Sequence, residues 1–265
     1  MKSMYQLNQI PSEAQIRKYL RQIVFGRHLF CPVCRSQKVV KYEHRYRCRK
    51  CRTKFSLLSH TWLGDMKLSY EKFWMVLWSW TTQIPVKQAQ ALTELSEEAV
   101  RRWYERFRQH LPEDHVILEK IVQLDEAYFK KWSLVMGKQP GTRKLAYTMM
   151  HGSVQRHHAT AFVEQHVKPR SQVNTDGALI YKTIDHWWPV IHERDIHAKW
   201  EFSKTSEIEG TFGNLRTFIR RMYHHSTPEK LPDYVREFCA RFSLPEIFKD
   251  PRHYLKKTLS LVPID

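Results

Sequence analysis

Four of the five cysteines stand in two pairs, Cys31 with Cys34 and Cys48 with Cys51, and this spacing constrains the fold more than any other feature. A Cys-x2-Cys turn brings two thiolates together, and two such turns complete a tetrahedron around one zinc ion. The closed set of four ligands predicts a structural site, because no coordination position stays open for catalysis. Residues 39–47, between the pairs, mix apolar, aromatic and charged side chains, which favours a short hairpin.

Two further residues bear on this site. His44 lies between the pairs and is an alternative ligand, although a solvated position in the hairpin is favoured. Cys239 has no partner in the sequence and is predicted to be a small buried apolar residue.

Residues 1–15 lack the apolar segment of a secretory signal, and the longest apolar run, 73–80, is too short to span a bilayer. We therefore expect a cytoplasmic protein with no membrane partner, in which paired cysteines bind metal rather than form disulfides.

The balance of charge favours a nucleic-acid partner. The chain carries 44 Lys and Arg against 27 Asp and Glu, a net charge of +17.

Apolar spacing predicts helices over 68–82 and 86–95. Ser96 then stands as an N-cap before a basic helix over 99–111. This order favours a helix-turn-helix, with a plain helical hairpin as the alternative. Its candidate DNA-binding residues are Arg101, Arg102 and Arg106.

The second half has the pattern of an α/β domain. Residues 121–129, 144–150 and 171–176 are predicted strands, and residues 159–167 and 206–223 are predicted helices. Asp125 falls inside the first strand, where a buried carboxylate is costly unless it is paired or metal-bound. Asp125 and Glu126 should point to opposite faces of that strand, so only one of them can join a given site.

The last of these helices carries a charged stripe. At about 100° per residue, Glu209, Arg216 and Arg220 share one face of the helix. The predicted packing face is a different one, formed by Phe212, Leu215, Ile219 and Met222. One carboxylate beside two arginines suits binding of metal and then phosphate, and a solvated stripe is the equally weighted alternative.

The ordered set of motifs resembles the zinc-ribbon DDE transposases of bacterial insertion sequences. After the four cysteines and the helix-turn-helix come Asp125-Glu126-Ala127-Tyr128-Phe129, Thr175-Asp176-Gly177 and Ile208-Glu209-Gly210. The later segments Tyr223-His224-His225 and Tyr234-Val235-Arg236-Glu237-Phe238 continue the resemblance, which spans nearly the whole chain.

The resemblance implies a multi-domain protein: an N-terminal helix and zinc ribbon (1–60), a helix-turn-helix region (61–115), an α/β ribonuclease-H-like catalytic domain with a mixed central sheet (116–245) and a C-terminal tail (246–265). It implies that Asp125, Asp176 and Glu209 bind two divalent cations, Mg²⁺ or Mn²⁺, beside the structural Zn²⁺. Arg216 would contact phosphate. The expected partners are double-stranded DNA, as terminal inverted repeats and target, and a second copy of the chain in a homodimer or higher oligomer, associated with the bacterial nucleoid.

Several choices stay open at this stage. Glu207 is two residues from Glu209 and lies about 200° around the helix, so only one can reach the site; Asp185 and Asp195 are alternatives by spacing. The separation between Asp125 and Asp176 is shorter than expected for this family, and we predict a shortened or missing strand before residue 159.

Three rival functions also stay open, and the departure in spacing favours the first of them. They are an inactive or repurposed transposase-derived DNA-binding protein, a ribonuclease-H-like nuclease of repair or recombination, and a zinc-ribbon subunit of an RNA-processing machine.

Overall fold

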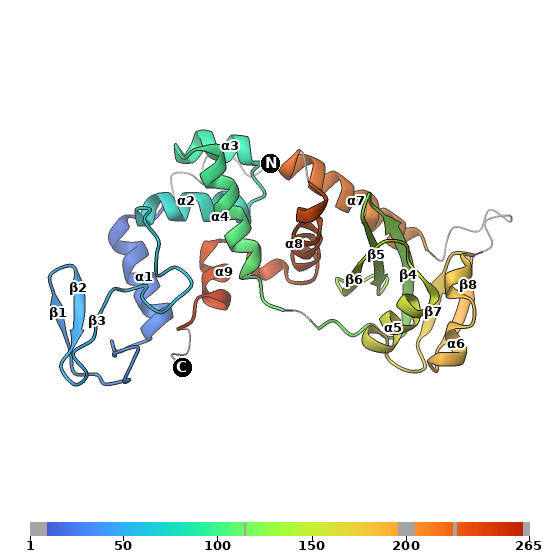
Figure 1. Cartoon of the computed structure of the whole chain (residues 1–265), viewed down its shortest axis with the longest axis horizontal. Helices are drawn as coiled ribbons and strands as arrows, with labels where there is room; N and C mark the ends of the chain where they lie inside the picture. The colour runs from blue at the N-terminus through green and yellow to red at the C-terminus, as the bar shows by residue number, and fades with distance from the viewer. Residues whose placement is uncertain (1–9, 114, 196–204, 225–226, 262–265) are drawn as a thin grey trace. The chain divides into compact units, whose positions relative to one another are not determined.

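The computed structural model describes residues 10–113, 115–195, 205–224 and 227–261 (Figure 1). The chain divides into two compact units: residues 1–110 with 246–265 form unit 1, and residues 111–245 form unit 2. Unit 1 is therefore built from both ends of the chain. In the described part, no helix has the length and apolar character needed to cross a bilayer.

Unit 1 contains a small antiparallel sheet and a set of helices. The sheet has the order β1-β2-β3, with strands Val39–Tyr42, Arg45–Cys48 and Lys54–Phe55, so the predicted hairpin is confirmed. The helices are α1 (Glu13–Phe25), α2 (Tyr70–Thr81), α3 (Val86–Thr93), α4 (Glu97–Gln109) and α9 (Pro251–Thr258).

Capping side chains define where these helices begin. The Ser12 hydroxyl accepts from the Gln15 amide at the start of α1, and the Gln15 side chain accepts in return from the Ser12 backbone amide. Ser96 caps α4 as predicted, by accepting from the Ala99 amide at 3.2 Å. Both devices satisfy backbone N–H groups that a helix leaves unpaired at its N-terminus.

An aromatic core holds the helices of unit 1 together. Trp80 of α2 and Phe107 of α4 are fully buried, and their ring centroids lie 5.4 Å apart. Tyr254 of α9 packs against Trp80 at 5.1 Å, and its hydroxyl donates to the Phe107 carbonyl at 2.8 Å. Residues 246–265 thus contribute core contacts to this unit, and η5 (Pro245–Phe248) adds Phe248 against Trp80.

Unit 2 is a five-stranded sheet with helices on both faces. The strands are β4 (Ile121–Tyr128), β5 (Trp132–Lys138), β6 (Leu145–His151), β7 (Gln172–Thr175) and β8 (Ile191–Arg194), in the order β6-β5-β4-β7-β8. The first three strands are antiparallel, and β7 and β8 add in parallel. This mixed order, with crossovers through helices, is that of a ribonuclease-H-like fold and confirms the predicted fold class.

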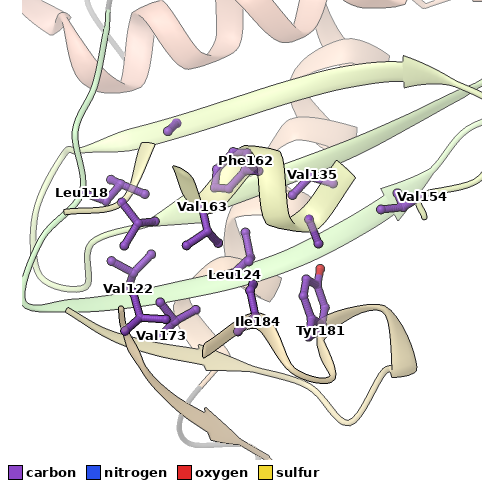
Figure 2. Packing of buried hydrophobic residues seen from close by; sticks show 14 residues of the cluster. Leu118, Val122, Leu124, Val135, Val154, Phe162, Val163, Val173, Tyr181 and Ile184 are labelled. Atoms are coloured by element: carbon purple, nitrogen blue, oxygen red, sulfur yellow. The ribbon is translucent and has the colours of Figure 1, made fainter. Parts of the chain in front are cut away.

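One face of this sheet is covered by α5 (Arg156–His166), η2 (Leu179–Tyr181) and α6 (Ile184–Trp187). Figure 2 shows the apolar cluster beneath α5, where Phe162 and Val163 lie over Leu118 and Val135. Gly137 of β5 gives room for this packing, because a Cβ would lie 2.7 Å from Leu118 Cδ1 and 2.9 Å from Phe162 Cε1 and would force these side chains to shift. The other face packs against α7 (Ser206–Tyr223) and α8 (Leu231–Ser243), and η4 (Pro228–Lys230) leads into α8.

In the described residues no strand lies between β6 and α5, as predicted, but the inference that the sheet is therefore incomplete is wrong. The sequence interpretation overlooked β5, Trp132–Lys138, so the predicted strand at 144–150 is the third strand of the domain and not the second. Six of the seven residues of β5 are buried, because helices cover both faces of the sheet at this position, so the run shows no alternation of polar and apolar residues. All five strands of the fold are present in the described residues.

Candidate zinc and carboxylate sites

The four cysteines converge at one end of the small sheet in unit 1. The Sγ atoms of Cys31 and Cys51 lie 3.5 Å apart, as do those of Cys34 and Cys48, and all four lie within 4.8 Å of one another. These distances are too long for disulfides and near the roughly 3.8 Å edge of a tetrahedron with Zn–S bonds of about 2.3 Å. The cysteines therefore fit a Zn²⁺ ion as its four ligands.

The two knuckles are built alike. Arg35 and Arg52, each directly after the second cysteine of its pair, have φ angles of 59° and 63°. The amides of Cys31 and Cys48 donate to the carbonyls of Ser36 and Thr53, five residues onward in each knuckle. His44 is exposed in the turn between β1 and β2, as favoured from the sequence, and Cys239 is buried in unit 2.

The surroundings of the four thiols differ. Burial raises the pKa of Cys31 to about 12, whereas hydrogen bonding with Thr53 lowers the pKa of Cys51 to about 6. Only thiolates bind zinc, so a bound cation must supply the energy that deprotonates the buried Cys31.

Two of the predicted catalytic aspartates lie at the same level of the large sheet. The parallel register of β4 and β7 pairs Ile121 with Gln172 and Gln123 with Asn174. Continued by two residues along both strands, this register sets Asp176 beside Asp125. Asp125 and Asp176 are close in sequence for this family, which had suggested a decayed domain. The register shows that this separation still places the two aspartates side by side on adjacent strands.

Asp125 lies at the centre of the acidic group. Burial, together with the charges of Glu126, Asp176 and Glu209, raises its pKa from 3.8 to about 7. Its Oδ1 accepts from the Glu126 amide at 2.8 Å, and the Asp176 Oδ1 accepts from the Ala178 amide at 3.0 Å. The structure thus brings Asp125, Asp176 and Glu209 into one electrostatic environment.

The four carboxylates divide between the two faces of the sheet. Glu126 accepts a hydrogen bond from the Tyr181 hydroxyl of η2, and burial raises the pKa of Glu126. Gln123, two residues before Asp125, accepts from the Ile208 amide at 2.9 Å and so marks the face that α7 covers. Asp125 shares that face with Glu209, as the alternation along a strand requires. The Glu126–Tyr181 pair was not anticipated, because it depends on where η2 folds back.

Glu207 is engaged elsewhere. Its carboxylate pairs with the buried Lys138 of β5 and accepts from the Gly141 amide at 3.2 Å, and these contacts lower its pKa. Asp185 is exposed on α6, and Asp195 is fully buried at the end of β8.

The stripe on α7 forms as predicted, with Glu209, Arg216 and Arg220 exposed. On its packing face Phe218 is buried and Ile219 only partly, which corrects the prediction for Ile219.

The predicted helices around the candidate DNA-binding arginines are present, as α2, α3 and α4. Arg101 pairs with Glu97 at 2.7 Å and Arg102 with Glu98 at 2.6 Å, each one turn apart. Arg106 donates to Asp65 at 2.5 Å and to the Trp62 carbonyl, and its guanidinium lies 5.3 Å from the Trp103 ring centre. Arg106 therefore holds the loop at residues 62–65 against α4.

The fold and these two sites define a zinc-ribbon protein with a carboxylate-bearing ribonuclease-H-like domain. Residues 11–54 match the transposase zinc-ribbon domain, and residues 130–243 match the ISXO2-like transposase domain, a range that contains Asp176 and Glu209 and begins after Asp125. An uncharacterized protein in transposable element ISH50 of Halobacterium salinarum is 24% identical over 286 residues, covering 94% of this chain and 96% of that protein. The chain belongs to the insertion-sequence transposase family with an N-terminal zinc ribbon.

Proposed function

We propose that the protein is a DDE transposase that cleaves the 3′ ends of its element and joins them to target DNA. The observation that carries this proposal is the meeting of Asp125, Asp176 and Glu209 on β4, β7 and α7. An acidic group in which neighbouring charges raise the pKa of one member favours cations, and hard oxygen ligands suit Mg²⁺ or Mn²⁺.

The carboxylates would bind two ions, as the resemblance to DDE transposases implies and as transfer of a phosphodiester favours when the ions lie about 3.5–4 Å apart. Among the described residues, the cysteines are the one group of three or more potential ligands within 4.8 Å of one another, so the carboxylates do not form so tight a group in this structure. When bound, such ions activate the attacking hydroxyl and stabilise the leaving oxygen. Asp125 would contact both, with Asp176 and Glu209 on either side.

The arginines of α7 would bind the DNA backbone. Arg216 and Arg220 are exposed on the stripe of Glu209, where a guanidinium can donate to a phosphate beside the reacting one. Of the two, Arg216 is the stronger candidate for a phosphate contact, because it lies one turn nearer to Glu209 than Arg220 does. No covalent protein–DNA intermediate is needed, because the 3′ hydroxyl itself attacks the target phosphate.

Unit 1 would recognise the terminal inverted repeats through the zinc ribbon and the helix-turn-helix. Arg101 and Arg102 lie on one helix and are tied to glutamates of the same helix, so they can exchange those partners for phosphates at small cost. Arg106 already bonds inside unit 1 and is a weaker candidate. Synapsis of two DNA ends implies at least a dimer on DNA.

A strand-transfer assay tests this function. Zinc-loaded protein is mixed with Mg²⁺ or Mn²⁺ and a labelled duplex carrying the terminal repeat, beside Asp125→Asn, Asp176→Asn and Glu209→Gln. We expect metal-dependent 3′ nicking and joining, reduced at least about 1,000-fold in each variant because each removes a charged ligand. Asp185→Asn, which changes an exposed carboxylate of α6, is the matched control, and it should retain activity within a few-fold.

The other outcomes separate the rival functions. End-specific binding without nicking in either metal would identify a repurposed DNA-binding protein. Cleavage without preference for the terminal repeat would identify a nuclease. The complete five-stranded sheet removes the main reason for expecting an inactive domain.

A further inference from the structure

A third aspartate lies at the level of the two proposed catalytic aspartates. The parallel register of β7 and β8 pairs Gln172 with Ile191 and Thr175 with Arg194. Continued by one residue along both strands, it sets Asp195 beside Asp176, and the Asp195 amide donates to the Thr175 carbonyl at 2.8 Å. Three adjacent parallel strands thus carry Asp125, Asp176 and Asp195 in one row.

Asp195 differs from the other two in its exposure. Its side chain is fully buried, whereas Asp125 and Asp176 are partly exposed. A carboxylate without solvent access is unsuited to bind an ion that must also reach DNA. Its Oδ2 instead accepts from the hydroxyl of Thr205 at 3.1 Å.

Thr205 connects this buried carboxylate to Glu209. The same hydroxyl lies 3.2 Å from Glu209 Oε1, and the Glu209 amide donates to the Thr205 carbonyl at 3.2 Å. Thr205 is only 1% exposed, so its geometry is fixed by the residues around it. One threonine therefore contacts Glu209 through both its side chain and its backbone.

Thr205 stands at the start of α7, where its hydroxyl would be expected to have a different partner. Thr205 is the N-cap of α7, where a threonine hydroxyl ordinarily accepts from a backbone amide of the first turn. Here the side chain makes no capping bond. The helix start forgoes a stabilising cap, and the hydroxyl, which has one proton to donate, lies between the two carboxylates instead.

Two more contacts fix the first turn of α7 on the sheet. Gln123 of β4 accepts from the Ile208 amide, and Lys138 of β5 pairs with Glu207. With Asp195 at the end of β8, the turn is fastened to three strands. These contacts set the rotation of the helix, and the Thr205 hydroxyl adds control of the Glu209 carboxylate itself.

We infer that Asp195 and Thr205 are positioning residues that orient Glu209 as a metal ligand. This inference rests on the proposed function, in which Glu209 binds a catalytic cation. Partners that orient metal ligands are expected to change metal affinity by about 10-fold to 100-fold when removed. Asp195 acts through Thr205, and neither residue touches DNA or the ions in this scheme.

The test uses Thr205→Val, which keeps the shape and removes the hydroxyl, beside Thr205→Ser, which keeps the hydroxyl. Binding of Mn²⁺ to the zinc-loaded full chain is measured by calorimetry, and 3′ nicking is measured across Mn²⁺ concentrations. We expect Thr205→Val to weaken Mn²⁺ binding about 10-fold, with nicking recovered at saturating Mn²⁺, and Thr205→Ser to stay within about 2-fold. Asp195→Asn should resemble Thr205→Val and serves in its place if the valine variant does not fold.

The outcomes separate this inference from the proposed function. If Glu209→Gln abolishes Mn²⁺ binding while folded Thr205→Val and Asp195→Asn bind as the wild type does, the positioning role is overturned and the transposase proposal stands. Equal losses in the valine and serine variants also overturn it, because packing would then be the cause. If the wild type neither binds Mn²⁺ nor nicks DNA, the proposed function fails and the inference fails with it.

Discussion

The zinc site and the carboxylate site are both groups of anionic ligands, but they are assembled in opposite ways. The four cysteines come from one short segment, residues 31–51, with two similar knuckles, and their sulfurs lie within 4.8 Å of one another. The carboxylates come from β4, the end of β7 and α7, which are far apart in the sequence. The first arrangement depends on its ion for its shape, whereas the second is held by a sheet and helices that pack without one.

This difference determines how each part of the protein should respond when its cation is absent. In the ribbon, the surrounding core is small, so removing the cation leaves little to hold the knuckles together. In the sheet domain, the packed core persists, and the burial of Asp125 together with repulsion among the acids is a stability penalty, which is seen in the raised pKa of Asp125. Without metal, the zinc ribbon should unfold, whereas the five-stranded sheet domain should stay folded.

The largest expected effect is therefore removal of zinc. Chelation, or Cys31→Ser, should unfold β1–β3, because zinc binding by small domains supplies on the order of 10 kcal/mol of folding free energy. Amide hydrogen exchange should show the ribbon unprotected while β4 to β8 stay protected. His44→Ala is the control and should keep one zinc per chain. A ribbon that stays protected without zinc would abolish the contrast between the two sites.

The next effect concerns Asp125 and its dependence on pH. The folded-state pKa is about 7, above the ordinary value of 3.8, so between these values the folded protein binds more protons than the unfolded chain. The stability of unit 2 should then fall as pH rises from about 4 to 7 in buffer without Mg²⁺ or Mn²⁺. At pH 8, Asp125→Asn should raise its free energy of unfolding by about 2–3 kcal/mol, with a smaller gain at pH 5.

This prediction is checked by hydrogen exchange of β4 and β7 in urea, with zinc retained. Asp185→Asn, on the exposed surface of α6, is the matched control and should change little. A less stable Asp125→Asn at pH 8 would mean that a charged, buried Asp125 among other acids does not destabilise unit 2.

A smaller effect is expected for Tyr181→Phe. The variant removes the hydroxyl that donates to Glu126, and a largely buried carboxylate that loses its donor costs about 1–2 kcal/mol. Urea denaturation of unit 2 measures the loss. Tyr128→Phe is the comparison, since that hydroxyl is exposed and 3.4 Å from Glu126, and its effect should stay within about 0.5 kcal/mol. Equal effects would show that the buried donor has no special role.

The parts of the molecule that depend on local pattern could be predicted from the sequence. The cysteine spacing identified the ribbon, and the apolar period with its charged stripe gave the helix at residues 206–223 with the bounds of α7. Ser96 was found because an N-cap is a local signal. These features depend on neighbours within a few residues.

The remaining features depend on how distant strands align. β5 was missed because burial on both faces removes the alternating pattern, and β8 is only four residues long. The short separation between Asp125 and Asp176 became interpretable only when β4 and β7 were seen to be adjacent and parallel. The Glu126–Tyr181 contact depends on where η2 folds back, and the Asp195–Thr205 contact depends on where β8 ends and α7 begins, so neither leaves a mark in the local sequence.

The division of unit 1 between the two ends of the chain has a consequence for synthesis. The ribosome completes residues 111–245 before it makes α9, so the sheet domain has its whole sequence while the N-terminal unit still lacks Tyr254 and Phe248. A product ending at residue 245 would retain every proposed catalytic carboxylate and lose part of the aromatic core that packs against α2 and α4. Synthesis of residues 246–258 thus completes the unit that is proposed to select the DNA, and a chain that stops before them would carry the proposed catalytic residues without that finished unit.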